Sequence, residues 1–200
     1  MSKLPSSPDP LIPSSLAQKT VLRDQARRHR TLTDIRDEDI EAATPLFFDA
    51  IKPQAGQVIA AYWPKGREFD PTGILERALN ENLTCALPKV EVDTKILRFI
   101  QWDHKTKLVK GAFGILEPEE GEELQPDIFL VPMLAFDRKG HRLGQGGGYY
   151  DTTLAQARTQ KDITAIGIAY ASQAVLFNLP VEDHDQKMDW ILTPKGITKT

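Results

Sequence analysis

The sequence has little cysteine, little excess charge of either sign and no long hydrophobic run, and each absence excludes a class of protein. Its single cysteine, Cys85, can form no internal disulfide and lacks the partners of a zinc site. This favours a reducing compartment. The formal net charge is −3 over 200 residues, which argues against a protein held mainly by the phosphates of long nucleic acids. We therefore expect no nucleic-acid partner.

Membrane insertion and secretion are not expected either. No apolar run approaches the ~18 residues that cross a bilayer. Four prolines interrupt the first 14 residues, which lack the apolar core of a secretory signal. We predict a disordered Pro/Ser-rich arm over residues 1–14, a single domain over 15–200, no membrane partner and a cytoplasmic location.

Helical and extended patterns alternate along the rest of the chain. A first helix is predicted from Leu16 to about Arg30. A second is predicted to begin near Thr33 or Asp37 and to reach Ile51, although Pro45 can break or kink it. Beyond them, we predict strands over 57–63, 84–88, 96–102, 127–131, 163–169 and 190–192, helices over 71–79 and 149–158, and mostly loop over 108–126. This alternation predicts an α/β fold: a mostly parallel sheet with helices on both faces.

A glycine-rich segment between a buried strand and a helix is the most informative part of the sequence. Its glycines are Gly144, Gly146, Gly147 and Gly148. Glycine lets backbone N–H groups converge on one point, and a helix N-terminus adds partial positive charge, so the segment favours a phosphate. It is not a Walker A loop, because no Gly-Lys-Ser/Thr follows, and it is not the dinucleotide fingerprint, because Tyr149 stands where the third glycine would fall. The alternative is a loop that needs glycine only for its shape.

Charged residues near this loop have two interpretations each. Asp151 suits a Mg²⁺ ion bound to nucleotide phosphates, or it complements the helix dipole. Asp185 lies in an acidic loop and could join the same ion, although a solvated surface loop is the commoner case. The basic residues at 19, 23, 27 and 30 share one helix face, which is solvated unless phosphates lie beside it.

Aromatic residues and one further acid are candidates for binding a flat heterocycle. Trp63, Tyr149 and Tyr150 could stack on such a ring, although core packing is the favoured role for each of them. Glu68 could hydrogen-bond a ligand or simply be exposed. We find no residue pair suited to covalent catalysis.

Residues 132–151, which read PMLAFDRKGHRLGQGGGYYD, resemble the central signature of the 5-formyltetrahydrofolate cyclo-ligase family. The stretches KTVLR at 19–23, FGILEP at 113–118 and PVEDHD at 180–185 are also similar to that family. The resemblance covers roughly residues 16–195. It implies a three-layer α/β/α Rossmann-like domain that couples ATP hydrolysis to closure of 5-formyltetrahydrofolate into 5,10-methenyltetrahydrofolate, with release of ADP and phosphate.

The resemblance also implies roles for individual residues. It assigns catalysis to Arg142 and Asp151, and Mg²⁺ to Asp151 and Asp185. It assigns ATP to Lys19, Arg23, Arg142, Leu143, Gly144, Gln145, Gly146, Gly147, Gly148, Tyr149 and Tyr150. It assigns the folate to Arg23, Trp63, Glu68, Gln145, Gly146, Gly147, Gly148 and Tyr149. Gln145 and Gly147 stand where relatives often carry Arg and Lys, so this loop has less charge. The alternative function is a non-catalytic folate or nucleotide binder, although Arg142 and Asp151 are both present.

Overall fold

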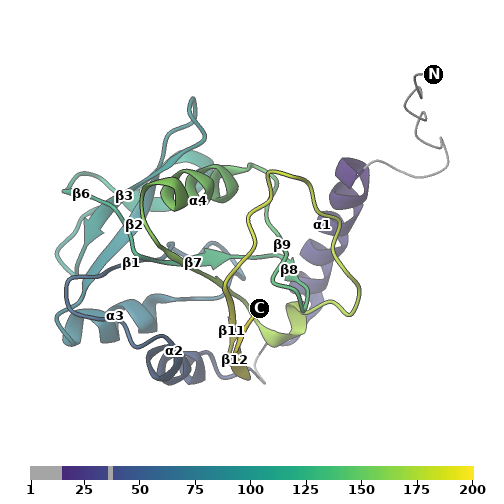
Figure 1. The fold of residues 1–200 in the computed structure, drawn as a ribbon, viewed down its shortest axis with the longest axis horizontal. Coiled ribbons are helices and arrows are strands. Elements are labelled where there is room, and N and C mark those ends of the chain that lie inside the picture. The colour runs from purple at the N-terminus through teal and green to yellow at the C-terminus, as the bar shows by residue number, and fades with distance from the viewer. Residues whose placement is uncertain (1–14, 36–37) are drawn as a thin grey trace, which may run out of the picture.

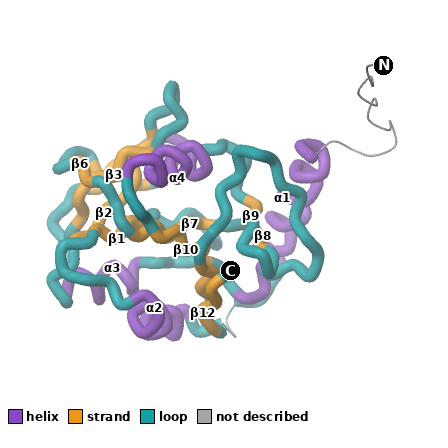
Figure 2. The backbone as a smooth tube through the Cα atoms, viewed as in Figure 1, coloured by secondary structure: helices purple, strands orange, loops and turns teal. Residues whose placement is uncertain are grey.

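The computed structural model describes residues 15–35 and 38–200. The arm predicted at 1–14 lies outside these residues. In the described part of the chain, eight strands form the main sheet (Figures 1 and 2). Their order is β12 (Gly196–Lys199), β11 (Trp190–Thr193), β10 (Thr164–Ile168), β7 (Ile128–Pro132), β1 (Val58–Ala60), β2 (Thr84–Val90), β3 (Leu97–Trp102) and β6 (Glu123–Leu124).

The middle of the sheet is parallel and its edges are antiparallel. From β11 to β2 each neighbouring pair is parallel, whereas β12, β3 and β6 pair antiparallel. The predicted mostly parallel sheet is thus confirmed.

Helices cover both faces of the sheet. Helices α2 (Ala43–Ile51) and α3 (Thr72–Asn80) lie on one face, and α4 (Tyr149–Gln160) lies on the other (Figure 1). Strand β7 is buried on both sides: Ile128 and Leu130 belong to the α2–α3 core, and Phe129 and Val131 to the α4 core. This alternation of buried residues explains the continuous apolar runs of the central strands and confirms the three-layer fold.

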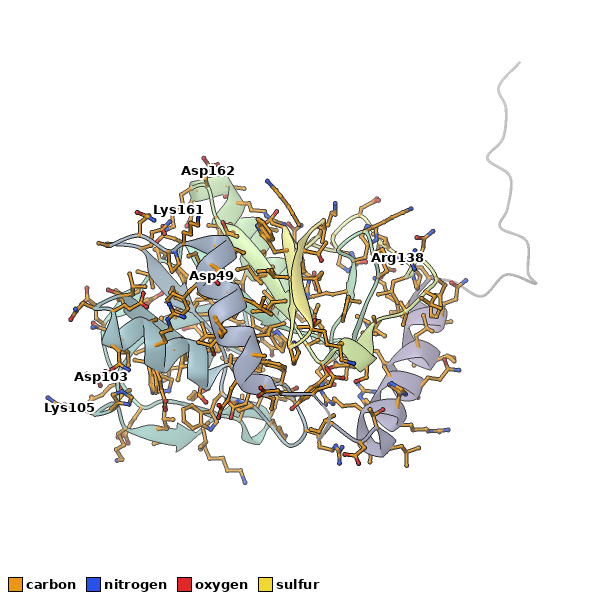
Figure 3. All side chains as sticks on the ribbon, turned by 90° about the horizontal axis from the view of Figure 1, so that it is seen from below. Asp49, Asp103, Lys105, Arg138, Lys161 and Asp162 are labelled. Atoms are coloured by element: carbon orange, nitrogen blue, oxygen red, sulfur yellow. The ribbon has the colours of Figure 1, made fainter. Side chains whose placement is uncertain are left out.

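Helix α1 (Ser15–Leu32) lies at one end of the molecule, beside the hairpin of β8 (Ala135–Phe136) and β9 (Arg142–Leu143) (Figure 1). A small cluster holds them together, with Leu22 of α1 packed against buried Leu143 and Leu179. Figure 3 labels Arg138 at this end and Asp103 and Lys105 at the opposite end. Short 3-10 helices occur at Ile40–Ala42, Ala112–Gly114 and Ala171–Gln173.

Two local predictions were wrong. The segment 108–126, expected to be mostly loop, contains β4 (Leu108–Lys110), β5 (Leu116–Pro118) and the edge strand β6. These strands are too short to show a period-2 pattern. Helix α2 begins at Ala43, and Pro45 does not break it, because Pro45 stands in the first turn, where a backbone N–H needs no helical partner.

The topology brings two predicted segments to one place. From β1 the chain order continues to β2 on one side, whereas β7 and β10 lie on the other. In parallel α/β sheets, ligands bind at the carboxyl ends of strands where the order reverses in this way. The segment with Trp63 and Glu68 follows β1, and the glycine loop lies between β7 and α4.

Candidate active site

The glycine loop ends at the N-terminus of α4. Gly146 has φ of +102° and Gly148, the N-cap of α4, has φ of +75°, a region that disfavours other residues. A Cβ at Gly147 would meet Cδ2 of Tyr149 at 2.8 Å. No side chain among the described residues caps α4, so the first-turn N–H groups are left for an anion.

Arg142 and Asp151 form a nearly buried ion pair at this helix end. Arg142 Nη2 lies 2.9 Å from Asp151 Oδ1, and the Arg142 side chain is only 4% exposed. Gln186 N donates to the same Oδ1 at 2.9 Å, and Arg142 Nη1 donates to the Gln186 carbonyl oxygen at 2.8 Å. The charge of Asp151 is therefore compensated within the protein, which neither of its two sequence interpretations anticipated.

Lys19 is buried and faces two carboxylates. Its Nζ lies 2.7 Å from Glu182 Oε2 and 2.5 Å from Asp185 Oδ2. Hydrogen bonds from Lys19 and Ser15 lower the pKa of Glu182. The structure thus brings Lys19 and Asp185 together, and a phosphate bound here would have to share the Lys19 ammonium with them.

Asp151 and Asp185 offer suitable oxygens for a hard cation. The contacts of Asp151 with Gln186 and Arg142 use Oδ1, and the hydrogen bonds that Asp185 accepts from Lys19 and Glu182 use Oδ2. Gln186, the residue after Asp185, contacts Asp151 directly. Among the described residues, Glu182, His184 and Asp185 form a group whose potential ligand atoms lie within 4.8 Å of one another, and this group does not include Asp151. Carboxylate donors fit Mg²⁺.

Two arginines on the basic face of α1 contact the glycine loop. Arg23 Nε donates to the Gly144 carbonyl oxygen at 3.1 Å, and its guanidinium lies against Gly146. Arg27 donates to both the carbonyl oxygen and Oε1 of Gln145, at 3.1 and 3.3 Å. The alternative of a wholly solvated face is therefore wrong.

Glu68 joins this group from the segment after β1. Its side chain is 12% exposed and lies 3.7 Å from Arg30, measured from Oε1 to Nη1. Gln145 Nε2 donates to the same oxygen at 3.3 Å. A cavity of about 500 Å³ is lined by residues 32–35, Gly66, Arg67, Glu68 and Tyr170. Glu68 therefore borders a space of ligand size.

The predicted aromatic residues have different surroundings. The ring of Trp63 packs edge-on against Trp102, with centroids 6.3 Å apart, and joins the α2–α3 core. Tyr149 packs against Phe113 at 5.7 Å. The hydroxyl of Tyr150 is buried and has no hydrogen-bond partner among the described residues. Burial, and then the charge of Glu68, raise the pKa of Tyr150, whereas the charge of Arg142 lowers it. The Tyr150 hydroxyl is thus a protonated donor.

Sequence reasoning missed four contributors to this site: Arg30, Glu182, Gln186 and Phe113. Arg30 shares the helix face of the predicted residues, and Glu182 belongs to an acidic loop, so both left a signal. Gln186 acts through its backbone and leaves none. Leu143, predicted to bind ATP, has its side chain buried against α1, so only its backbone can contact a nucleotide.

Comparisons with known proteins agree on one family. The profile of the 5-formyltetrahydrofolate cyclo-ligase family matches residues 15–194. The chain is 33% identical to a 5-formyltetrahydrofolate cyclo-ligase of Haemophilus influenzae, over 82% of this chain and 91% of that one. It is 29% identical to a mitochondrial one of Arabidopsis thaliana, over 92% and 76%. The 5,10-methenyltetrahydrofolate synthetase of Aquifex aeolicus superposes with a TM-score of 0.74 at 29% identity, over 90% and 92%. Each helix of the described residues is too short or too polar to span a bilayer.

Proposed function

The chain belongs to the 5-formyltetrahydrofolate cyclo-ligase family, and we propose that it closes 5-formyltetrahydrofolate into 5,10-methenyltetrahydrofolate at the expense of ATP. The observation that carries this proposal is the convergence of the uncapped α4 N-terminus, the Arg142–Asp151 pair and Glu68 at the carboxyl ends of β1 and β7.

The reaction needs charge neutralisation and positioning more than a protein nucleophile. The formyl oxygen attacks the γ-phosphorus of ATP, and the bond to ADP breaks. The N10 nitrogen then attacks the formyl carbon and loses its proton, the ring closes, and the oxygen leaves with the phosphate. A loose phosphoryl transition state is stabilised by donors placed around its oxygens. Glycine-loop N–H groups, Arg23 and Arg142 are the donors we assign to this task.

Mg²⁺ would be held by Asp151 and Asp185, whose carboxylates suit it. When bound, it would neutralise charge on the ATP phosphates. Release of Asp151 from part of its contact with Arg142 would free that guanidinium for phosphate oxygens.

Glu68 and the neighbouring cavity are the place we propose for the folate ring. A carboxylate accepts hydrogen bonds from ring N–H groups, and Glu68 lines the cavity. Gln145 of the glycine loop donates a hydrogen bond to Glu68, so the proposed nucleotide site and the proposed folate site are adjacent. We assign Trp63 and Tyr149 to the folate as predictions. A cytoplasmic location and the absence of a nucleic-acid partner also stay predictions, and one relative is mitochondrial.

An absorbance assay tests the proposal. Purified protein, 5-formyltetrahydrofolate and MgATP are mixed, and the methenyl product is followed, with ATP or Mg²⁺ omitted as controls. We expect product only in the complete mixture. Binding of both ligands without product would contradict catalysis and support the non-catalytic binder.

A further inference from the structure

Four side chains link α1 to both halves of the site. Arg27 donates to Gln145, Gln145 donates to Glu68, and Glu68 pairs with Arg30. Arg27 and Arg30 are one helical turn apart on α1, so the chain of contacts begins and ends on the same helix. Helix α1 therefore holds the glycine loop and the Glu68 segment in one arrangement.

Arg30 occupies an unusual position for a surface arginine. Its side chain is only 14% exposed, and its partner Glu68 is 12% exposed. The surface pair Arg77–Glu81 is far more open, with side chains 40% and 46% exposed. Water screens the exposed pair strongly but screens the Arg30–Glu68 pair much less.

Glu68 is held on both of its oxygens. The backbone N–H of Lys65 donates to Oε2 at 3.0 Å and fixes the turn. Gln145 donates a hydrogen bond to Oε1, and Arg30 forms an ion pair with the same oxygen. The turn contact alone leaves the carboxylate free to rotate about the bonds of its side chain. The two contacts on Oε1 supply the remaining constraint.

We propose that Arg30 is a positioning residue that fixes the Glu68 carboxylate for the folate, with Arg27 fixing Gln145 in the same network. Arg30 touches neither substrate in this arrangement and acts through Glu68. The inference rests on the proposed function, because it takes Glu68 as the group that receives the folate ring.

Replacement of Arg30 separates this role from a structural one. Arg30→Met keeps the apolar stem of the side chain and removes its charge. We expect the KM for 5-formyltetrahydrofolate to rise about tenfold, the size of a lost charge-assisted contact, with the KM for ATP changing much less. Arg30→Lys should recover part of the loss. Arg28→Met, an exposed position on the same helix, is the matched control and should resemble the parent.

A double variant tests whether Arg30 acts through Glu68. In Arg30→Met/Glu68→Gln the folate KM should be no higher than in Glu68→Gln alone, because contacting residues are not additive. Additive effects, or a parent-like KM for Arg30→Met, would overturn the proposal. If the parent makes no product, calorimetry without ATP can compare the affinities of the same variants for 5-formyltetrahydrofolate. Failure of the proposed function is therefore distinguishable from failure of this inference.

Discussion

Helices α1 and α3 are attached to the rest of the protein by different means, although a small apolar cluster that includes Leu22 also holds α1. The buried residues of α3 are Ile74, Leu75 and Ala78, which pack under the sheet. The buried residue of α1 is Lys19, and three arginines follow it along the same face toward the glycine loop and Glu68.

The difference separates stability from function. Apolar burial is non-directional and stabilises whichever helix supplies it. Ion pairs and hydrogen bonds contribute little net stability but fix geometry. Helix α3 therefore serves the core, whereas α1 serves the site, and substitutions in the two regions should change different measurements.

The largest expected effect is on stability and lies in α3. Leu75 is fully buried, so Leu75→Ala should lower the free energy of unfolding by about 2–5 kcal/mol, from lost burial and the cavity left behind. Val21→Ala on α1, where Val21 is 56% exposed, should change it by less than about 0.5 kcal/mol. Denaturant unfolding measures both, and equal losses would remove the contrast between the helices.

Asp151 should show the largest loss of activity. Asp151→Asn removes a charge proposed to hold Mg²⁺ and to orient Arg142, so kcat should fall ~10²-fold, about 2.7 kcal/mol. Stability should also fall, since nearly buried Arg142 loses its partner. Asp162→Asn, an exposed position just past α4 (Figure 3), is the control. Near-parent turnover of Asp151→Asn at saturating Mg²⁺ would refute the assignment.

Buried Tyr62 and half-buried Tyr150 sharpen the same contrast. The Tyr62 hydroxyl donates to the Phe69 carbonyl oxygen at 2.7 Å, whereas the Tyr150 hydroxyl has no partner among the described residues. Tyr62→Phe should therefore lose about 1 kcal/mol of stability. Tyr150→Phe should lose none and should lower kcat/KM about tenfold, ~1.4 kcal/mol, if its hydroxyl meets a substrate between Glu68 and Arg142. Thermal unfolding and the product assay, made on both variants, check this; unchanged activity of Tyr150→Phe would exclude the hydroxyl from the reaction.

Local signals made much of the fold predictable. The buried strands appeared as apolar runs, and the helix predicted over 71–79 is α3, just before which the Asp70 carboxylate accepts a hydrogen bond from Thr72 N at 2.9 Å. The edge strand β12 was missed, because its pairing with β11 leaves two of its residues exposed and no clear pattern. The site was predictable where one short segment carries it, as in the glycine loop.

Long-range pairings were not predictable from the sequence. Lys19 meets Glu182 and Asp185 from 163 and 166 residues away, and nothing local to Lys19 distinguishes it from a solvated lysine. Helical spacing placed Arg30 on the basic face of α1, but nothing in the sequence showed that Arg30 reaches Glu68. Its contact with Glu68 depends on how α1 is placed beside the sheet.

The smallest expected effect concerns two glycines with the same backbone strain. Gly148 and Gly56 have φ of +75° and +88°, and a Cβ at either would find no atom within 4 Å. Alanine at each should therefore lose a similar stability, on the order of 1 kcal/mol.

Of these two glycines, only Gly148 lies at the proposed phosphate site, so only there should the added methyl group affect ATP binding. Gly148→Ala should weaken ATP binding in calorimetry by several-fold beyond its shift in melting temperature, since the methyl stands at the N-terminus of α4, where a phosphate oxygen must approach. Gly56→Ala should bind ATP as the parent does. If both variants bind ATP equally well, the glycine loop owes its composition to its shape alone, and the nucleotide must bind through the α1 side chains instead.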